Sequence, residues 1–374
     1  MKKAYNFSIL QHCLLVIGLA ILQLTAFAGD DLSKTITREF NIAANGTTEL
    51  SNKYGKMDIN VWDRNQVKIT VTVKVSANNE RKAQDALDGI DVDFSNSSDY
   101  VSAETEFDFK GWNNNNVNYK VAYEVYMPAT NQLKASMKYG NLRLGKLQGR
   151  GEIEVKYGNF YIESLGDNSS IELAYSNSDC TILAAQNLEC DVSYSRMHIY
   201  EAKDIELDSK YCQGMEIESC RNLEIDSGYD RYTIGKANRL ELDTEYSNFT
   251  LVEVEDATIE ADYTNVKIEQ LKNSLDIELS YNNCVIEKVM KGFSLVKVDG
   301  SHANFKLGVE AGSSYRLQAE GKYSNVRFDD EGMTIRRDIQ KSNAFEIEGA
   351  KGAANARSRI VAELSYGGLK IWEE

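Results

Sequence analysis

A tyrosine followed by a small or polar residue, and often then by asparagine, recurs at short and nearly constant spacing along most of this sequence. Between Tyr139 and Tyr281 the successive markers are 17 to 19 residues apart. A repeat of this length cannot bury its own apolar face, so neighbouring copies must stack. The marker positions are Tyr54, Tyr139, Tyr157, Tyr175, Tyr194, Tyr211, Tyr229, Tyr246, Tyr263, Tyr281, His302, Tyr323 and Tyr366.

Apolar residues alternate on both sides of each marker. Positions −4 and −2 are mostly apolar, as in Ile259 and Ala261, and so are positions +3 and +5, as in Phe249 and Leu251. Alternation with a period of two predicts two short strands that meet near the tyrosine. The tyrosine shares the parity of positions −4 and −2, so we expect its ring to point inward, with a corner at position +1.

These patterns predict an all-β fold, a parallel β-solenoid (single-stranded β-helix) with coils of about 18 residues. A single proline, Pro128, and many tyrosines agree with a strand-rich chain. Asparagines at position +2 would stack as a hydrogen-bonded ladder. A sandwich of meandering hairpins is the alternative, but it would not keep the residue types in fixed columns. The expected organisation is a signal peptide at 1–28, a less regular β-rich cap with one short helix at 29–135, and the solenoid with a closing coil at 136–374.

The N-terminus has the pattern of a secretory signal peptide. Lys2 and Lys3 precede an apolar run that ends near Phe27, and Ala26 and Ala28 fit a small-x-small cleavage site. An uncleaved anchor is the alternative reading of this segment. We expect an exported protein of the periplasm or cell surface, with no transmembrane segment after cleavage.

The remaining chain is strongly acidic. Removing residues 1–28 leaves 40 basic and 57 acidic residues, a net charge of about −17. A surface of this charge repels nucleic acids and anionic membranes, so we expect neither as a partner.

Carboxylates occupy position −3 in eleven copies of the repeat, and more stand at position −5. Both positions share the outward parity. One interpretation is a solvated face that maintains solubility and blocks sheet association. The other is a surface for cations, with weak calcium binding, for which the candidate residues are Asp226, Asp243, Glu260 and Glu278.

Catalytic motifs are missing from the sequence. We interpret His302 as an inward filler, and His198 as an outward residue with no acid indicated beside it. The five cysteines of the mature chain fit no metal or redox spacing, and we expect buried free thiols. The sequence therefore predicts a protein that is not an enzyme and has no cofactor.

Val121–Pro128, followed by Leu133–Leu144 with Lys138-Tyr139-Gly140-Asn141, resembles the bacterial exported "putative adhesin" family of unknown function. The resemblance implies an envelope β-solenoid and suggests adhesion. We therefore expect a non-catalytic adhesin-like or scaffolding protein that acts through its extended surface on an envelope polysaccharide or protein. A carbohydrate-active solenoid enzyme, either a polysaccharide lyase or a hydrolase, and a periplasmic sensor or regulatory partner are the alternatives.

Overall fold

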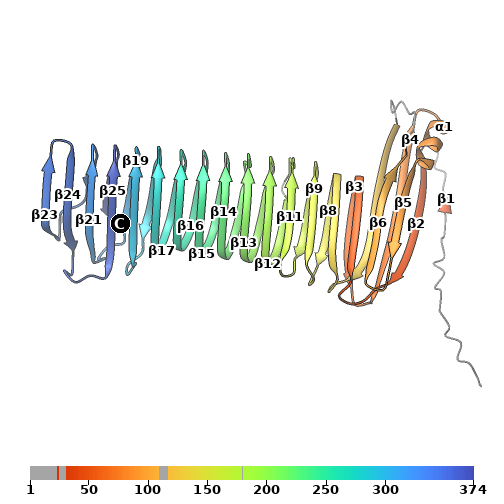
Figure 1. The fold of residues 1–374 in the computed structure, drawn as a ribbon, viewed down its shortest axis with the longest axis horizontal. Helices are drawn as coiled ribbons and strands as arrows, with labels where there is room; N and C mark the ends of the chain where they lie inside the picture. Colours follow the sequence, from red (N-terminus) through yellow and green to blue (C-terminus); the bar gives the residue numbers. More distant parts are fainter. Residues whose placement is uncertain (1–22, 25–30, 109–116, 179) are drawn as a thin grey trace, which may run out of the picture.

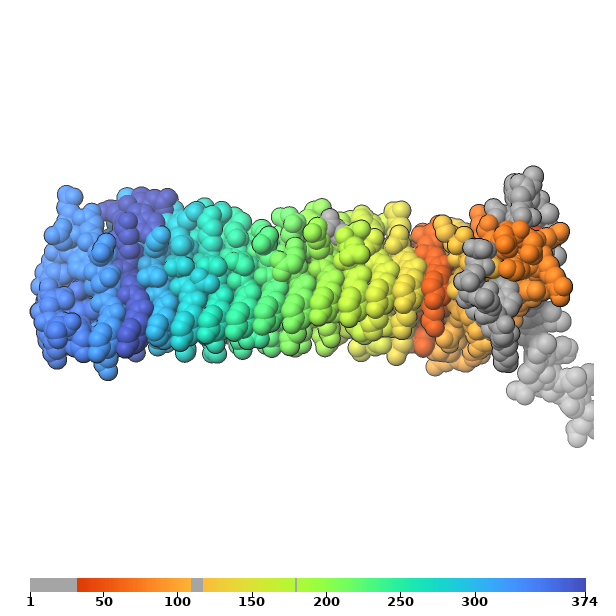
Figure 2. Space-filling view, turned by 90° about the horizontal axis from the view of Figure 1, so that it is seen from above, coloured from red at the N-terminus to blue at the C-terminus, as the bar shows by residue number. Residues whose placement is uncertain are grey.

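The computed structural model describes residues 23–24, 31–108, 117–178 and 180–374, and within them the chain forms a long rod (Figures 1 and 2). The all-β prediction is confirmed, because almost every element in this part of the chain is a strand. One helix, α1 (Glu80–Asp88), lies where the sequence predicts it and is capped by Asn79, whose side chain accepts from the Lys82 amide. The expected signal peptide lies, except for residues 23–24, outside the described residues.

The N-terminal end of the rod combines antiparallel and parallel pairs. β2 and β4 are antiparallel, as are β4 and β7, and β5 and β6, whereas β3 pairs in parallel with β6, β7 and β8. α1 packs beside these strands at the end of the rod (Figure 1). The strands are β1 (Gln23–Leu24), β2 (Asp31–Asn41), β3 (Thr47–Trp62), β4 (Gln66–Ala77), β5 (Ile90–Asn96), β6 (Tyr100–Phe107), β7 (Val117–Pro128) and β8 (Gln132–Lys146).

We call each structural repeat a coil. From β8 to β20, each strand pairs in parallel with its equivalent in the next coil along the rod. Asp226 pairs with Asp243, for example, and Ile259 with Ile277. Like residues therefore lie above one another along the rod. The strands are β9 (Gly151–Lys156), β10 (Asn159–Ser164), β11 (Ser169–Ala174), β12 (Cys180–Ser193), β13 (Met197–Lys210), β14 (Met215–Gly228), β15 (Arg231–Glu245), β16 (Asn248–Asp262), β17 (Asn265–Ser280), β18 (Asn283–Val289), β19 (Leu295–Ser301) and β20 (Asn304–Val309).

At the C-terminal end the order along the rod departs from the order in the sequence. The last coil, β25 and β26, lies between the coil of β19 and β20 and that of β21 and β22 (Figure 1). An antiparallel hairpin, β23 and β24, extends the β21 edge. These strands are β21 (Tyr315–Lys322), β22 (Asn325–Arg327), β23 (Met333–Lys341), β24 (Ala344–Lys351), β25 (Ser358–Ser365) and β26 (Gly368–Glu373).

The predicted inward direction of the marker tyrosines is wrong. All thirteen marker residues have φ between 49° and 63°, and the twelve tyrosines among them are 37–58% exposed. This left-handed backbone turns the chain so that the marker faces outward and position +1 faces inward. Positions −2 and +3 both face inward, so the alternation of inward and outward residues must be broken once between them. The structure breaks it at positions −1 and 0, which both face outward, and position +1 then faces inward.

On the interior side of several corners, the residue at position +1 accepts a hydrogen bond from the preceding coil. The Ser176 amide donates to Ser195 Oγ, and the Ser247 amide donates to Thr264 Oγ1, both at 3.0 Å. The amide of position +1 is buried here, so an oxygen from the next coil provides the partner it needs. Asp230 has this role for the Cys212 amide, at 2.5 Å, and burial raises the pKa of its carboxyl group.

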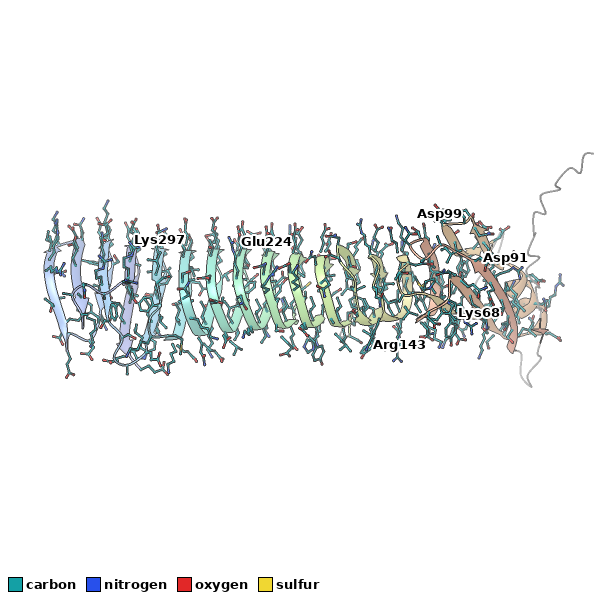
Figure 3. All side chains as sticks on the ribbon, turned by 90° about the horizontal axis from the view of Figure 1, so that it is seen from below. Lys68, Asp91, Asp99, Arg143, Glu224 and Lys297 are labelled. Atoms are coloured by element: carbon teal, nitrogen blue, oxygen red, sulfur yellow. The ribbon has the colours of Figure 1, made fainter. Side chains whose placement is uncertain are left out.

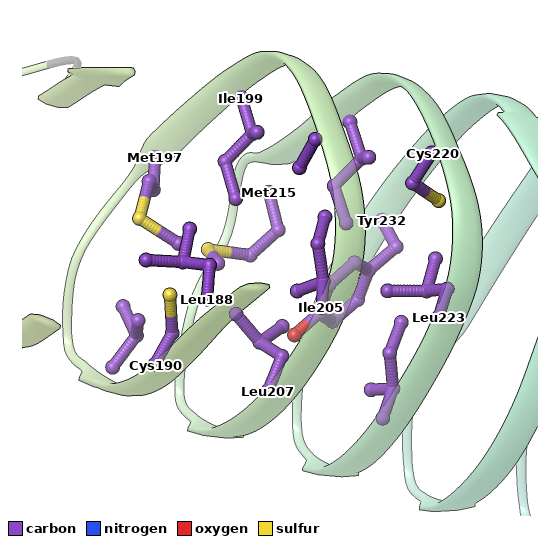
Figure 4. Close-up of a cluster of buried hydrophobic side chains, with 14 of the residues drawn as sticks. Leu188, Cys190, Met197, Ile199, Ile205, Leu207, Met215, Cys220, Leu223 and Tyr232 are labelled. Atoms are coloured by element: carbon purple, nitrogen blue, oxygen red, sulfur yellow. The ribbon is translucent and has the colours of Figure 1, made fainter. Parts of the chain in front are cut away.

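Apolar columns fill the rest of the rod interior (Figure 4). Ile205, Leu223 and Leu240, for instance, stack in register and are almost fully buried. The prediction that the cysteines are buried is confirmed, because all five lie in this core: Cys180, Cys190, Cys212, Cys220 and Cys284.

Candidate functional site

The outside of the corners carries a continuous stack of aromatic rings, which we call the tyrosine column. It follows the order of the coils in space: Tyr54, Tyr139, Tyr157, Tyr175, Tyr194, Tyr211, Tyr229, Tyr246, Tyr263, Tyr281, His302, Tyr366 and Tyr323. Neighbouring ring centroids are 4.8–5.2 Å apart and the ring planes differ by only 2–14°. Each ring in the stack therefore covers the faces of its neighbours.

Backbone hydrogen bonds and ring stacking together hold the column in place. The Tyr246 amide donates to the Asp262 carbonyl at 3.0 Å, and the Tyr263 amide donates to the Ser280 carbonyl at 2.9 Å, so each corner is tied to the next coil. Stacked aromatic pairs contribute about 0.5–1.5 kcal/mol beyond their buried area. These contacts offset the strain of a non-glycine residue at positive φ, which costs of order 1–3 kcal/mol.

The asparagines at position +2 form part of the predicted ladder. Asn265 Nδ2 donates to Asn248 Oδ1 at 3.1 Å, and Asn304 Nδ2 donates to Asn283 Oδ1 at 3.4 Å. Asn159 instead accepts from the Ser176 hydroxyl group. The asparagine column therefore runs beside the tyrosine column without forming one continuous chain of amide bonds.

The carboxylates of positions −3 and −5 form two parallel columns on one outer face of the rod. Strand pairing places Asp208, Asp226, Asp243, Glu260 and Glu278 in direct succession. The complete −3 column, in spatial order, is Glu154, Glu172, Asp191, Asp208, Asp226, Asp243, Glu260, Glu278, Asp299, Glu363 and Glu320. The sequence parity therefore predicted this outward column correctly.

At the N-terminal end of this face, lysines and arginine neutralise the carboxylates. Lys156 Nζ lies 2.7 Å from Glu154 and 2.5 Å from Glu172, and Lys134 Nζ lies 3.2 Å from Glu152. Burial alone would raise the pKa of Glu154, but hydrogen bonds from Lys156 and Ser136 and the charge of Lys138 lower it. The first coils of the acidic face are thus paired internally.

Farther along the rod the carboxylates lack such partners. Between Glu189 and Glu278, ten exposed carboxylates of these two columns form no ion pair with the residues that the structure describes, and we call them the bare acidic face. Figure 3 labels one of them, Glu224, on the opposite side of the rod from Arg143. The ten residues are Glu189, Asp191, Glu206, Asp208, Glu224, Asp226, Glu241, Asp243, Glu260 and Glu278.

Two shallow hollows lie on the acidic side of the rod. One is lined by carboxylates from Glu152 to Asp208, and the other by a set that includes Glu206, Glu224 and Glu241. Among residues 31–108, 117–178 and 180–374, no three histidine, cysteine or carboxylate side chains are grouped closely enough to hold a metal ion. Nor does this part of the chain contain a helix long and apolar enough to cross a membrane.

The interpretation of His302 is wrong, and that of His198 is right about its outward direction but wrong about its neighbours. His302 is exposed and stacks between Tyr281 and Tyr366, because it occupies a marker position. His198 does have acids beside it: its Nε2 lies 3.1 Å from Glu218 and its Nδ1 lies 3.7 Å from Glu216, both on the next coil. Distances between coils are not visible in a linear spacing, which explains the second error.

Comparisons with known proteins find no matching family model and no matching curated protein. Solved structures do match. A "putative adhesin" from Parabacteroides merdae has 13% identity and a TM-score of 0.28, with 74% of this chain and 92% of that chain covered. One from Bacteroides fragilis has 11% identity and a TM-score of 0.27, with coverages of 90% and 97%. A "putative cell adhesion protein" from Clostridium sporogenes has 10% identity and a TM-score of 0.18, with coverages of 91% and 100%.

These names agree with the adhesin resemblance that Val121–Pro128 and Leu133–Leu144 carry in the sequence. None of the three proteins is named as an enzyme.

Proposed function

We propose that this protein is a non-catalytic, adhesin-like rod, folded as a parallel β-solenoid, that binds an extended cationic partner along the bare acidic face. The parallel register of coil on coil supports the solenoid assignment. The observation that carries the binding proposal is the run of ten exposed carboxylates without ion pairs.

The geometry of this face suits a polymer better than a small ligand. Four successive coils of this face carry two of these carboxylates each and the next two carry one each, at roughly the strand spacing of 4.8 Å. Neighbouring unit charges at this distance repel by about 0.9 kcal/mol in bulk water. A flexible chain of amines or guanidinium groups would relieve that repulsion at every coil, which gives affinity by repetition. The signal-peptide pattern of residues 1–28 supports an envelope partner, an amine-bearing polysaccharide or a basic protein segment.

Binding to immobilised polycations tests the proposal. The purified full chain should bind chitosan or polylysine and not a polyanion, with an affinity that falls as salt screens the charges. The combined variant Glu224→Gln, Asp226→Asn, Glu241→Gln and Asp243→Asn should bind roughly tenfold more weakly or worse at low salt. The chitosan and polylysine arms separate a polysaccharide partner from a polypeptide one.

A matched variant controls for bulk charge. Asp91→Asn, Asp93→Asn, Glu201→Gln and Glu255→Gln together remove the same number of exposed aspartates and glutamates away from the bare acidic face. This variant should retain the wild-type affinity. Equal losses of affinity in the two variants would mean that binding depends only on the net charge of the protein, which would contradict a specific binding face.

A further inference from the structure

The tyrosine column plays no part in the proposed binding by the bare acidic face, and its stacked rings and exposed edges need a separate explanation. Aromatic side chains that bind sugars or bases offer a free ring face, but here each interior ring face lies against the next ring at about 4.9 Å. What remains accessible is the ring edges and the phenol hydroxyl groups. The column is therefore unsuited to binding planar ligands by stacking, while its phenols stay open to small reagents.

We propose that the tyrosine column is an oxidative modification site, at which a one-electron oxidant joins tyrosines of neighbouring coils as dityrosine. The tyrosine residues of the column are 37–58% exposed, and the rings of neighbouring coils stack against each other. The inference is independent of any partner bound at the bare acidic face.

The chemistry requires two equivalents of oxidant for each cross-link. Desolvation and the neighbouring phenols Tyr281 and Tyr246 raise the pKa of Tyr263, so its hydroxyl group starts protonated. Each of two adjacent phenols loses one electron to the oxidant and its hydroxyl proton to water, which leaves two neutral phenoxyl radicals. The radicals couple through the ring carbons next to the oxygens. Each ring then moves the hydrogen of its new bonding carbon to its oxygen, so two electrons and two protons leave in total.

Fixed proximity makes coupling within one chain the favoured outcome. Radicals on separate molecules must diffuse together, whereas neighbouring rings in the column are held at 4.9–5.2 Å over most of its length. Tyr161 and Tyr200 provide an internal comparison, because they are 38% and 45% exposed but lie against Arg143 and His198. They should form no cross-link within the chain.

His302 divides the column into two tyrosine segments. Ten tyrosines from Tyr54 to Tyr281 lie on one side of it, and Tyr366 and Tyr323 lie on the other. Histidine cannot complete a dityrosine bond, so the cross-links should stop at Tyr281 and resume between Tyr366 and Tyr323.

The test oxidises the purified full chain at low concentration with photochemically generated tris(bipyridine)ruthenium(III), a one-electron oxidant. Dityrosine fluorescence gives the yield, and mass spectrometry of proteolytic peptides locates each bond. Two expected cross-links join residues far apart in the sequence, Tyr54 with Tyr139 and Tyr323 with Tyr366, and they are diagnostic of the column.

Two variants keep the test sharp without removing a ring from the stack. Tyr246→Phe should abolish cross-links at position 246 and leave those between Tyr157 and Tyr175 unchanged. His302→Tyr should create new cross-links from position 302 to Tyr281 and Tyr366. Circular dichroism melting confirms that each variant is folded.

Cross-links confined to column neighbours and to Tyr119, whose ring lies 5.2 Å from that of Tyr54, with the expected changes in both variants, would support the proposal. Dityrosine that forms mainly between molecules, or equally at Tyr161 and Tyr200, would overturn it. So would a folded protein that yields no dityrosine under conditions that cross-link a tyrosine-containing reference protein.

Discussion

Inside the corners, position +1 is mostly glycine, serine or threonine, with Cys212, Asp230, Asn282 and Ala303 in the others, whereas the outside of each corner carries a half-exposed tyrosine or His302. The inner column is constrained by volume and by buried amides that require acceptors. The outer column is constrained only by contact with the rings above and below. One backbone conformation thus creates two neighbouring columns, of which the inner tolerates few changes in side-chain volume and the outer tolerates more. Both columns are regular in the sequence, so the pattern alone does not reveal which of them faces inward.

The largest expected effect comes from emptying an interior position. Phe249 is buried on the inner side of its coil, so Phe249→Ala should lower the free energy of unfolding by about 3–5 kcal/mol. Tyr246→Ala, on the outer side, loses two ring contacts and should cost only about 1–2 kcal/mol. Urea denaturation of both variants, with Tyr246→Phe as the near-neutral control, measures the difference. Equal losses in the free energy of unfolding for the two alanine variants would contradict the difference between an inner and an outer column.

Adding a single methyl group should affect stability very differently at two glycines, one in the inner column and one outside it. A Cβ at Gly158 would lie 1.8 Å from the Gly140 carbonyl oxygen, and the backbone leaves it no room. Gly158→Ala should therefore destabilise the protein by about 2–3 kcal/mol. Gly145→Ala is the matched control, since the nearest atom is 3.7 Å away, and it should change stability by less than about 0.5 kcal/mol. Thermal melting that ranks them the other way would contradict the packing of the inner column.

Asp230 makes the inner column sensitive to pH. Burial raises the pKa of its carboxyl group above the ordinary value of 3.8, so the folded protein holds that proton more tightly than the unfolded chain does. Its contribution to stability therefore falls as the pH rises through the folded pKa. Asp230→Asn keeps an acceptor for the Cys212 amide and should raise stability by on the order of 1 kcal/mol at neutral pH.

Melting curves of the wild type and Asp230→Asn from about pH 4 to about pH 8 check this sign. The advantage of the variant should shrink toward acidic pH. An advantage that grows as the pH falls would mean that the folded protein prefers the ionised carboxylate.

The smallest expected effect lies on the outer side. Millimolar calcium should raise the melting temperature more than sodium chloride of equal ionic strength, a gain worth less than about 1 kcal/mol, because it bridges carboxylates that repel one another. Replacing Asp226, Asp243 and Glu260 by Asn, Asn and Gln should remove the difference. Neutralising the lysine-paired Glu152, Glu154 and Glu172 should leave it intact. If calcium and sodium chloride act alike on the wild type, the bare acidic face is only a solvated surface.

The sequence predicted the strands and the outward carboxylate column because alternation along one strand is a local property. It could not decide the direction of the tyrosine ring, since positions 0 and +1 offer two solutions with the same flanking pattern. The mostly small residues at position +1, such as Gly158, Ser176, Ser247 and Thr264, were the signal that was missed, because small residues are typical of the inner side of a tight corner.

The candidate binding face was only partly predictable. Position −3 identified Asp226 and Glu260, but whether a carboxylate is paired depends on side chains one coil away. Lys156, for example, reaches Glu172 on the next coil. The spatial order of the last coils was also beyond the sequence, because β25 and β26 insert before β21 and β22 although they follow them in the chain.

The parallel register also bears on how such a molecule can change length. Each coil between β12 and β17 meets only the coil before it and the coil after it, and those two present nearly the same surface. Deleting one whole coil, residues 229–245, would join two coils whose surfaces already pack against coils of the same kind. The rod would become roughly 4.8 Å shorter. The reach of the molecule is therefore adjustable in fixed steps, through duplication or loss of single coils, while the chemistry of its outer face is carried over unchanged.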